Sequence, residues 1–159
     1  DLSDLDKYQR LIILDQIEDP HNLGAIIRSA ESFGFDGVII PERRSASVSP
    51  IVYKTSAGAI NNINVIMVKN INRSIEEIKE AGFWVYGLAG EASSPIDNTD
   101  LKGKVCLVVG NEGKGLSRLV RENCDILINI PMKGFVNSLN ASVASAIAMY
   151  EVLRQNGFS

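Results

Sequence analysis

Six short apolar runs recur along the chain, and turn-forming residues separate each run from the next. Most of these runs are apolar at every position rather than at alternate positions. This pattern is typical of parallel strands that are covered on both faces of a sheet. The six predicted strands cover residues 11–14, 37–40, 64–68, 84–88, 105–109 and 126–130.

Between the strands, apolar residues recur at spacings of three and four and predict helices. One such stripe covers residues 23–33 and stops at Gly34, and another covers residues 71–78 and stops at Gly82. Glycine commonly follows the last turn of a helix, so both ends are well marked. A third, longer helix near the C-terminus is predicted from a stripe formed by Leu139, Val143, Ile147, Tyr150 and Leu153.

The alternation of strands and helices predicts an α/β fold. We expect an open, mostly parallel six-stranded sheet with helices on both faces and right-handed crossovers. Ligands bind beyond the carboxyl ends of the strands in such sheets, so the loops that follow strands are the places to look for chemistry. Three of these loops are rich in polar residues and glycine, and they cover residues 15–28, 110–117 and 131–140.

The length of 159 residues and the 45% hydrophobic content fit one compact domain. No apolar run approaches the ~18 to 20 residues that cross a bilayer, and residues 1–6 are acidic and polar rather than a signal sequence. We therefore expect a cytoplasmic protein with no membrane partner. We expect residues 11–159 to form the folded domain and residues 1–10 to be a linker.

Cysteine and histidine usage argues against several kinds of site. Cys106 lies in an apolar run and Cys124 follows eighteen residues later, without further Cys or His at the spacing of metal ligands. We expect two buried thiols and no metal. His21 is the only histidine, and nothing near it suits a hydrolase triad. The net charge of −3 does not suggest a large RNA-binding surface, because affinity for phosphates comes chiefly from clustered Lys and Arg.

A glycine-rich loop, Gly-Asn-Glu-Gly-Lys-Gly-Leu-Ser, follows the fifth predicted strand at residues 110–117. A Walker loop needs Ser or Thr after Lys114, where Gly115 stands, and a dinucleotide loop needs a third glycine where Arg118 stands. Taken alone, the loop is an ordinary tight turn that glycine permits. It nevertheless lets a ligand approach the backbone, and it holds Glu112 among its glycines.

Two polar positions open the first predicted helix. Asn22 lies near the helix start, where asparagine is a favoured cap, and Arg28 follows about a turn and a half later. A simple cap and a solvated surface charge are the alternative interpretation of these two residues.

The last predicted helix opens with a surplus of amide and hydroxyl groups at Asn137, Ser138, Asn140 and Ser142. One of these residues is enough to cap the helix. The pattern then leaves Asn140 in the first turn, where asparagine has no advantage over alanine. The surplus therefore indicates a function beyond capping.

Taken together, the three segments resemble the three motifs of the SpoU family of RNA 2'-O-ribose methyltransferases. Residues 22–34 (Asn-Leu-Gly-Ala-Ile-Ile-Arg-Ser-Ala-Glu-Ser-Phe-Gly) resemble the first motif, residues 108–117 the second and residues 130–144 the third. The resemblance covers roughly residues 11–154. The opening Asp-Pro-His-Asn at residues 19–22 is most similar to the subgroup that methylates a guanosine of large-subunit ribosomal RNA, with tRNA guanosine enzymes as near relatives.

The resemblance implies S-adenosylmethionine as the cofactor, RNA as the partner and a homodimer that completes the active site. It also implies a C-terminal trefoil knot, which general topology rules make improbable and which therefore depends on the family alone. The cofactor-binding residues that it implies are Gly90, Gly110, Ile130 and Leu139. The catalytic residues that it implies are Arg28, Glu112, Asn22, Ser138 and Asn140.

Two roles are open for the arginine. In the family, the residue that matches Arg28 is commonly assigned as the base, but a guanidinium ordinarily stays protonated in proteins. In the second role, Arg28 grips the adjacent phosphate and stabilises the forming alkoxide, while a phosphate oxygen, Glu112 or water takes the proton. Asn22 and Asn140 would orient RNA or Arg28, and Ser138 would position the cofactor or the hydroxyl.

The sequence leaves three alternatives for the partner and the activity. A guanosine of ribosomal RNA is the favoured substrate, tRNA is the second, and a non-catalytic RNA-binding module that keeps the fold is the third. Lys114, Arg118 and Lys133 lie near the expected site and supply local positive charge, although each also fits a solvated surface. Relatives of this subgroup usually carry a small N-terminal RNA-binding domain, and residues 1–10 are then expected to be its remnant or its linker.

Overall fold

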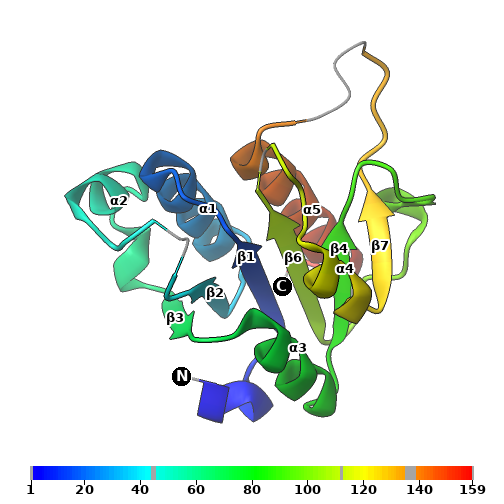
Figure 1. Ribbon diagram of the computed structural model, residues 1–159, viewed down its shortest axis with the longest axis horizontal. Helices are drawn as coiled ribbons and strands as arrows, with labels where there is room; N and C mark the ends of the chain where they lie inside the picture. The colour runs from blue at the N-terminus through cyan, green and yellow to red at the C-terminus, as the bar shows by residue number, and fades with distance from the viewer. Residues whose placement is uncertain (1, 44–45, 112, 135–138, 159) are drawn as a thin grey trace.

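The computed structural model describes residues 2–43, 46–111, 113–134 and 139–158. Within these residues, seven strands form one sheet in the order β3-β2-β1-β6-β4-β7-β5, and every neighbouring pair is parallel (Figure 1). The strands are β1 (Arg10–Asp15), β2 (Gly37–Pro41), β3 (Asn64–Val68), β4 (Trp84–Leu88), β5 (Ser94–Pro95), β6 (Val105–Gly110) and β7 (Ile126–Asn129).

The six predicted strands are all present, and their ends differ from the prediction by at most one residue. The seventh strand, β5, has only two residues and pairs with β7 through Ser94 and Pro95. It lies in a stretch rich in Ser, Pro, Asp and Gly that has no apolar run, so the hydrophobic pattern did not predict this strand.

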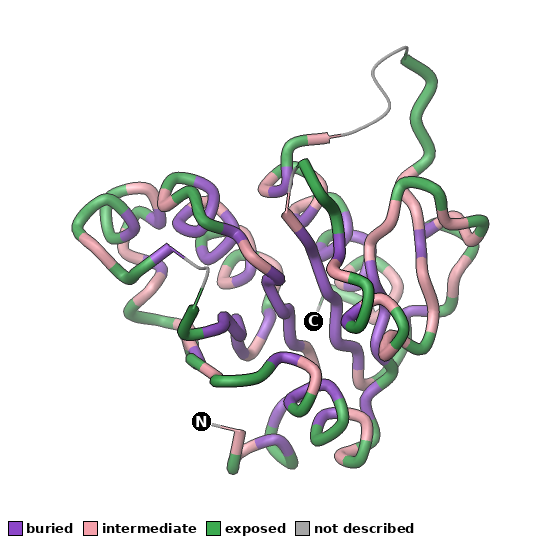
Figure 2. Tube along the Cα trace, viewed as in Figure 1, coloured by how far each residue is buried: buried purple, intermediate pink, exposed green. Residues whose placement is uncertain are grey.

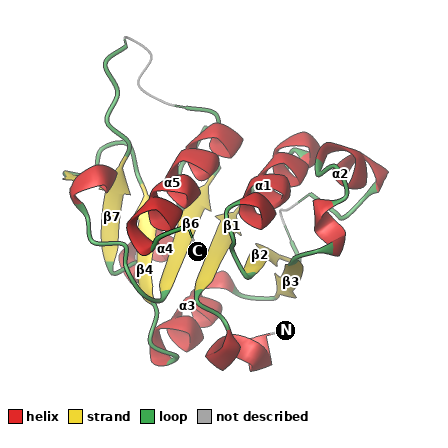
Figure 3. Ribbon diagram, turned by 180° about the vertical axis from the view of Figure 1, so that it is seen from behind, coloured by secondary structure: helices red, strands yellow, loops and turns green. Residues whose placement is uncertain are grey.

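Helices cover both faces of the sheet, as Figures 1 and 3 show from opposite sides. The α-helices are α1 (Pro20–Ser32), α2 (Pro50–Thr55), α3 (Ile71–Glu80), α4 (Arg118–Asn123) and α5 (Ala141–Asn156). Three short 3₁₀ helices, η1 (Leu2–Lys7), η2 (Ala59–Asn61) and η3 (Ile96–Asn98), complete the described elements. The helices α1 and α5 pack together on one face, and α3 and α4 pack together on the other.

The core has two layers because successive strand side chains point to opposite faces. In β1, Ile12 and Leu14 belong to the apolar cluster under α1 and α5, whereas Leu11 and Ile13 belong to the cluster under α3. All four side chains are fully buried, and Figure 2 shows buried chain through the middle of the sheet. The central strands are thus apolar at every position because both of their faces are covered.

The short helix η1 packs against the α3 face. Its Leu5, together with Tyr8, is buried in the same cluster as Ile75 and Ile78. The role of residues 1–10 as a linker stays a prediction.

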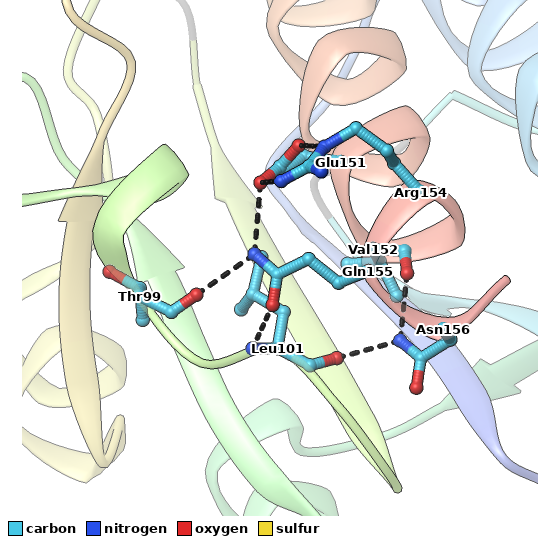
Figure 4. Close-up of polar contacts among 7 residues, drawn as sticks. All are labelled: Thr99, Leu101, Glu151, Val152, Arg154, Gln155 and Asn156. Carbon is cyan, nitrogen blue, oxygen red and sulfur yellow. Dashed lines mark hydrogen bonds and ion pairs between the residues drawn. The ribbon is translucent and has the colours of Figure 1, made fainter.

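Polar contacts fix the C-terminal half of α5 to the segment that leads into β6 (Figure 4). Gln155 accepts a hydrogen bond from the Leu101 N–H at 2.8 Å and donates to the Thr99 carbonyl at 2.9 Å. Asn156 donates to the Leu101 carbonyl at 2.9 Å. Gln155 also donates to Glu151 one turn earlier, at 2.9 Å. These contacts set the position of α5 relative to the sheet.

The C-terminal trefoil knot that the family resemblance implies stays an expectation. None of the helices in the described part of the chain is long and apolar enough to cross a membrane.

Candidate active site

A cavity of about 230 Å³ lies beyond the carboxyl ends of β4, β6 and β7 and opens on solvent. The loops that follow these three strands line it, together with the start of α5 and one residue of α4. The wall contains all four residues for which the resemblance implies cofactor contacts: Gly90, Gly110, Ile130 and Leu139. The fold thus brings together four positions that come from three separate segments, since Ile130 and Leu139 both lie between β7 and α5.

The loop after β6 folds back so tightly that its glycines are required. A Cβ on Gly110 would lie 2.3 Å from the carbonyl carbon of Gly115, a distance that real side chains do not show. Gly115 itself has a φ of +69°, in the left-handed region that favours glycine. Asn111 and Gly115 exchange backbone hydrogen bonds of 3.1 and 2.7 Å that close the turn. The backbone of this turn forms part of the cavity wall.

Two side chains connect this turn to the end of β1. Asn111 donates to the carbonyl of Gln16 at 3.1 Å. Asp15 is buried, and its carboxylate accepts from both the backbone N–H and the hydroxyl of Ser117 at 2.9 Å. Sequence reasoning missed Asp15, although an acidic residue directly after a fully apolar strand is the signal that could have identified it.

The rest of the wall is mostly apolar and includes Val109, Leu116 and Ile128. Asn129 is the polar exception on the β7 side, where its amide nitrogen donates to the carbonyl of Ala92 and so holds the loop after β4. The Asn129 side-chain oxygen is buried and has no hydrogen-bond partner within the described residues. The cavity therefore combines apolar surface, accessible backbone and few polar side chains, as small-molecule sites commonly do.

Only three charged side chains line the cavity within the described residues. They are Glu91, Lys114 and Arg121, and Arg121 forms an ion pair with Glu91 through its Nη2 atom. The pair joins the loop after β4 to α4. Sequence reasoning missed it because one residue lies in a loop and the other in a short helix thirty residues later, with no motif that connects them.

Two of the predicted catalytic residues lie on α1 and outside the cavity wall. Asn22 is buried within the first turn of α1, and the cap is Asp19, which accepts from the His21 N–H at 2.9 Å. The alternative interpretation of Asn22 as a simple cap is therefore wrong, because Pro20 starts the helix two residues earlier. Arg28 is exposed, and its guanidinium makes no hydrogen bond or ion pair with the described residues.

Asn140 lies at the edge of the cavity, between the lining residues Leu139 and Ala141. Its side-chain oxygen accepts from the Ser142 N–H at 2.8 Å and the Ser142 hydroxyl at 2.6 Å, so Asn140 is the N-cap of α5. The prediction that Asn140 lies in the first helical turn is wrong, because α5 begins only at Ala141. Glu112 and Ser138, the other two predicted catalytic residues, lie outside the described residues.

The thiols are unsuited to nucleophilic chemistry. Burial raises the pKa of Cys124 to about 12 and raises the pKa of Cys106 well above its ordinary value. Neither is in a disulfide. Within the described residues, no group of three or more His, Cys, Asp or Glu side chains is placed to hold a metal ion.

The outer face of α5, next to the cavity, is apolar and uncovered. Val143, Ile147 and Tyr150 follow one another at helical spacing and are 47%, 40% and 46% exposed. Tyr150 packs edge-on against Phe33, the residue that follows α1, at 5.8 Å between ring centroids. The predicted stripe on α5 thus exists, but most of it points away from the core.

Comparison with known proteins gives consistent results. Residues 9–150 match the profile of the SpoU rRNA Methylase family. A Synechocystis protein described as an uncharacterized tRNA/rRNA methyltransferase is 50% identical over 148 residues, which cover 93% of this chain and 38% of that protein. A Staphylococcus saprophyticus protein, whose name places it in the TrmH family of tRNA/rRNA methyltransferases, is 50% identical over 153 residues, or 96% of this chain and 61% of that one. The chain therefore spans less than two thirds of these relatives.

Solved structures resemble the fold closely. The SpoU methyltransferase AviRb from Streptomyces viridochromogenes, in complex with the cofactor AdoMet, has a TM-score of 0.85 and 30% identity, covering 93% of this chain and 61% of that chain. An AdoMet-bound rRNA methyltransferase from Sinorhizobium meliloti has a TM-score of 0.86 and 29% identity, covering 94% of this chain and 59% of that chain.

Proposed function

Because the chain belongs to the SpoU rRNA methylase family, we propose that it transfers a methyl group from S-adenosylmethionine to the ribose 2'-hydroxyl of an RNA nucleotide. The observation that supports this most directly is the cavity in which Gly90, Gly110, Ile130 and Leu139 meet. We further propose that residues 11–159 form the catalytic domain and that it acts in the cytoplasm.

The cavity fits the cofactor of the family, which is S-adenosylmethionine. Gly110 has no space for a side chain, so a ligand at this turn meets backbone groups directly. The apolar wall suits an adenine ring, and the buried side-chain oxygen of Asn129, which has no partner within the described residues, can accept a hydrogen bond there. Gly90, Gly110, Ile130 and Leu139 would hold the cofactor. When bound, it supplies an electrophilic methyl group on a sulfonium.

The chain's own residues then have to hold the ribose hydroxyl in line with that methyl group and assist the loss of its proton. An exposed guanidinium with no partner in the described residues suits Arg28 to a role in RNA binding. Arg28 would donate to the adjacent phosphate and to the ribose oxygen, which stabilises the charge as the alkoxide forms. A phosphate oxygen, Glu112 or water would take the proton.

The other polar residues would position these groups. The side-chain oxygen of Asn140 already accepts the two hydrogen bonds from Ser142 that cap α5. Its amide nitrogen would donate a hydrogen bond to RNA or to a carbonyl group near the ribose 2'-hydroxyl. Asn22 would support α1 beneath Arg28, and Ser138 would position the cofactor or the hydroxyl.

We also propose a homodimer that completes the active site. The uncovered apolar face of Val143, Ile147 and Tyr150 lies on α5, the helix whose first turn lines the cavity. Large apolar residues that follow one another on a soluble helix face indicate a protein–protein contact. Arg28, which lies outside the cavity of its own chain, would then reach the cavity of the partner.

A guanosine of ribosomal RNA is the substrate we favour, and tRNA is the alternative. The names of the relatives include both kinds of RNA. Mapping ribose methylation across ribosomal RNA and tRNA in a deletion strain tests the choice, because one missing mark identifies the substrate and the reaction together.

A transfer assay tests the activity itself. Tritiated methyl groups from S-adenosylmethionine are expected to appear in RNA as alkali-resistant 2'-O-methyl dinucleotides. Bound cofactor without any incorporation into ribosomal RNA or tRNA would favour a non-catalytic RNA-binding module instead.

A further inference from the structure

The ion pair between Glu91 and Arg121 lies in the cavity wall and has no part in the mechanism above. Glu91 belongs to the loop after β4 and Arg121 to α4, on the side of the sheet opposite α5. The two side chains are 63% and 35% exposed. Both therefore border the cavity and also reach solvent.

An exposed pair of this kind adds little to the stability of a fold, because water screens the attraction and two long side chains lose freedom. Its chemistry, however, suits a ligand. A guanidinium presents a planar fork of donors that matches a carboxylate, and here it already holds one, the carboxylate of Glu91. Glu91 is in turn an acceptor for a cationic group.

The remainder of the wall is apolar or backbone, apart from Lys114 and two asparagines. A ligand that is apolar over most of its surface and zwitterionic at one end would match this division. The cofactor of the proposed function has such an end, because its methionine part carries an α-carboxylate and an α-ammonium group.

We propose that Arg121 and Glu91 recognise the amino-acid end of the cofactor. Arg121 donates to the α-carboxylate, and Glu91 exchanges part of its contact with Arg121 for the α-ammonium group. The pair thereby sets the orientation of the cofactor in the cavity and selects for the intact amino acid. This assignment rests on the proposed function, since it concerns the same cavity.

Calorimetry with two ligands tests the assignment. S-adenosylhomocysteine carries the amino-acid end, whereas 5'-methylthioadenosine keeps the adenosine and the sulfur but lacks that end. We expect Arg121→Gln to weaken binding of S-adenosylhomocysteine by about 10- to 100-fold, the effect of losing a hydrogen bond to a charged group, and to leave methylthioadenosine binding unchanged. Glu91→Gln is expected to act in the same direction with a smaller loss.

Arg118→Gln is the matched control, because Arg118 lies on the same helix α4, is 89% exposed and does not line the cavity. It is expected to leave the affinity ratio of the two ligands unchanged. Unchanged binding of methylthioadenosine in the Arg121 and Glu91 variants also shows that the cavity still folds.

Two results would overturn the assignment while leaving the cofactor site intact. Equal losses for both ligands would mean that the pair supports the loops or contacts the ribose. If both variants bind both ligands with unchanged affinity, Arg121 and Glu91 contact neither ligand. If the unsubstituted protein binds neither ligand, the proposed function fails as well. Failure of the assignment alone leaves the unsubstituted protein able to bind both ligands.

Discussion

The cofactor half and the acceptor half of the proposed site are built differently. Gly110 and Leu139 lie in a wall of tightly packed backbone and apolar side chains from several segments of one chain. Arg28 lies outside that wall, exposed and without a side-chain partner in the described residues. In the proposed dimer, one chain forms the cofactor half by itself, whereas the acceptor half takes its arginine from the second chain.

The helices α3 and α5, on opposite faces of the sheet, differ in how far their large apolar residues are buried. On α3, Ile71, Ile75 and Ile78 are buried, so the large apolar residues face the core. On α5, Met149 and Val152 are buried beside small residues, whereas Ile147 and Tyr150 are exposed. A helix that leaves large apolar residues exposed is suited to pack against a second surface, and α5 leads directly from the cavity.

Gly110→Val is expected to have the largest effect, because it acts on the cavity itself. Its side chain would start 2.3 Å from the Gly115 carbonyl carbon and 2.5 Å from the Leu116 nitrogen, so the turn has to move. We expect S-adenosylhomocysteine affinity to fall by more than about 100-fold in calorimetry, and methyl transfer to be lost with it. Gly113→Ala is the control, since the nearest atom to a Cβ there is 3.6 Å away. Similar affinities in the two variants would contradict this reading of the turn.

Arg28→Ala is expected to separate the two halves. Methyl transfer should fall by about 10²- to 10³-fold, the usual effect of removing a donor that stabilises transition-state charge, while S-adenosylhomocysteine affinity stays unchanged. Arg73→Ala, an exposed arginine of α3, serves as the control and should leave both quantities unchanged. Equal loss of binding and transfer would make Arg28 a structural residue.

Ile147→Asp places a charge on the uncovered face of α5. We expect sedimentation to show a shift from dimer to monomer and transfer to fall by about tenfold or more, since an unpaired charge in an apolar contact is costly. Cofactor binding should change little, because the cavity belongs to one chain. Leu119→Asp on α4, where the leucine is 52% exposed, is the matched control. A variant that stays dimeric would exclude this face as the contact.

Glu151→Gln is expected to have the smallest effect and to change neither cofactor affinity nor methyl transfer. Hydrogen bonds from Arg154 lower the pKa of Glu151 below its ordinary value, and Gln155 adds another. The folded state therefore gains stability that is present above the ordinary pKa of a glutamate and is lost as the pH falls through the lowered value. We expect Glu151→Gln to lower the free energy of unfolding by only about 1 kcal/mol at neutral pH, because solvent screens Arg154. In acid, the difference between the two proteins should be smaller. A difference in the free energy of unfolding that grows in acid would contradict the lowered pKa of Glu151.

The sequence predicted the fold where the pattern was long and apolar, and it failed where elements were short. β6 is apolar throughout, so its position followed directly from the sequence. The helices α2 and α4 have six residues each, too few to show a helical period, and they were not predicted. The true helix caps, Asp19 and Asn140, became clear only with the backbone in place.

The site was predictable only in part, for a related reason. Family motifs identified Gly110 and Leu139, which lie within recognisable segments. The roles of Asp15, Glu91 and Arg121 depend on contacts between segments that are far apart in the sequence, and no spacing along the chain reveals them. Most of the apolar stripe on α5 points to solvent. The sequence does not predict this, because it depends on which side of the helix the sheet covers.

Mixing the Arg28→Ala and Gly110→Val proteins tests most directly whether two chains share one acceptor site. Each protein alone is expected to be inactive. If Arg28 serves the cavity of its partner, half of the randomly mixed dimers contain one complete site, and transfer should return to about a quarter of the normal rate. If the mixture is as inactive as its components, although sedimentation shows mixed dimers, then Arg28 does not act across the interface.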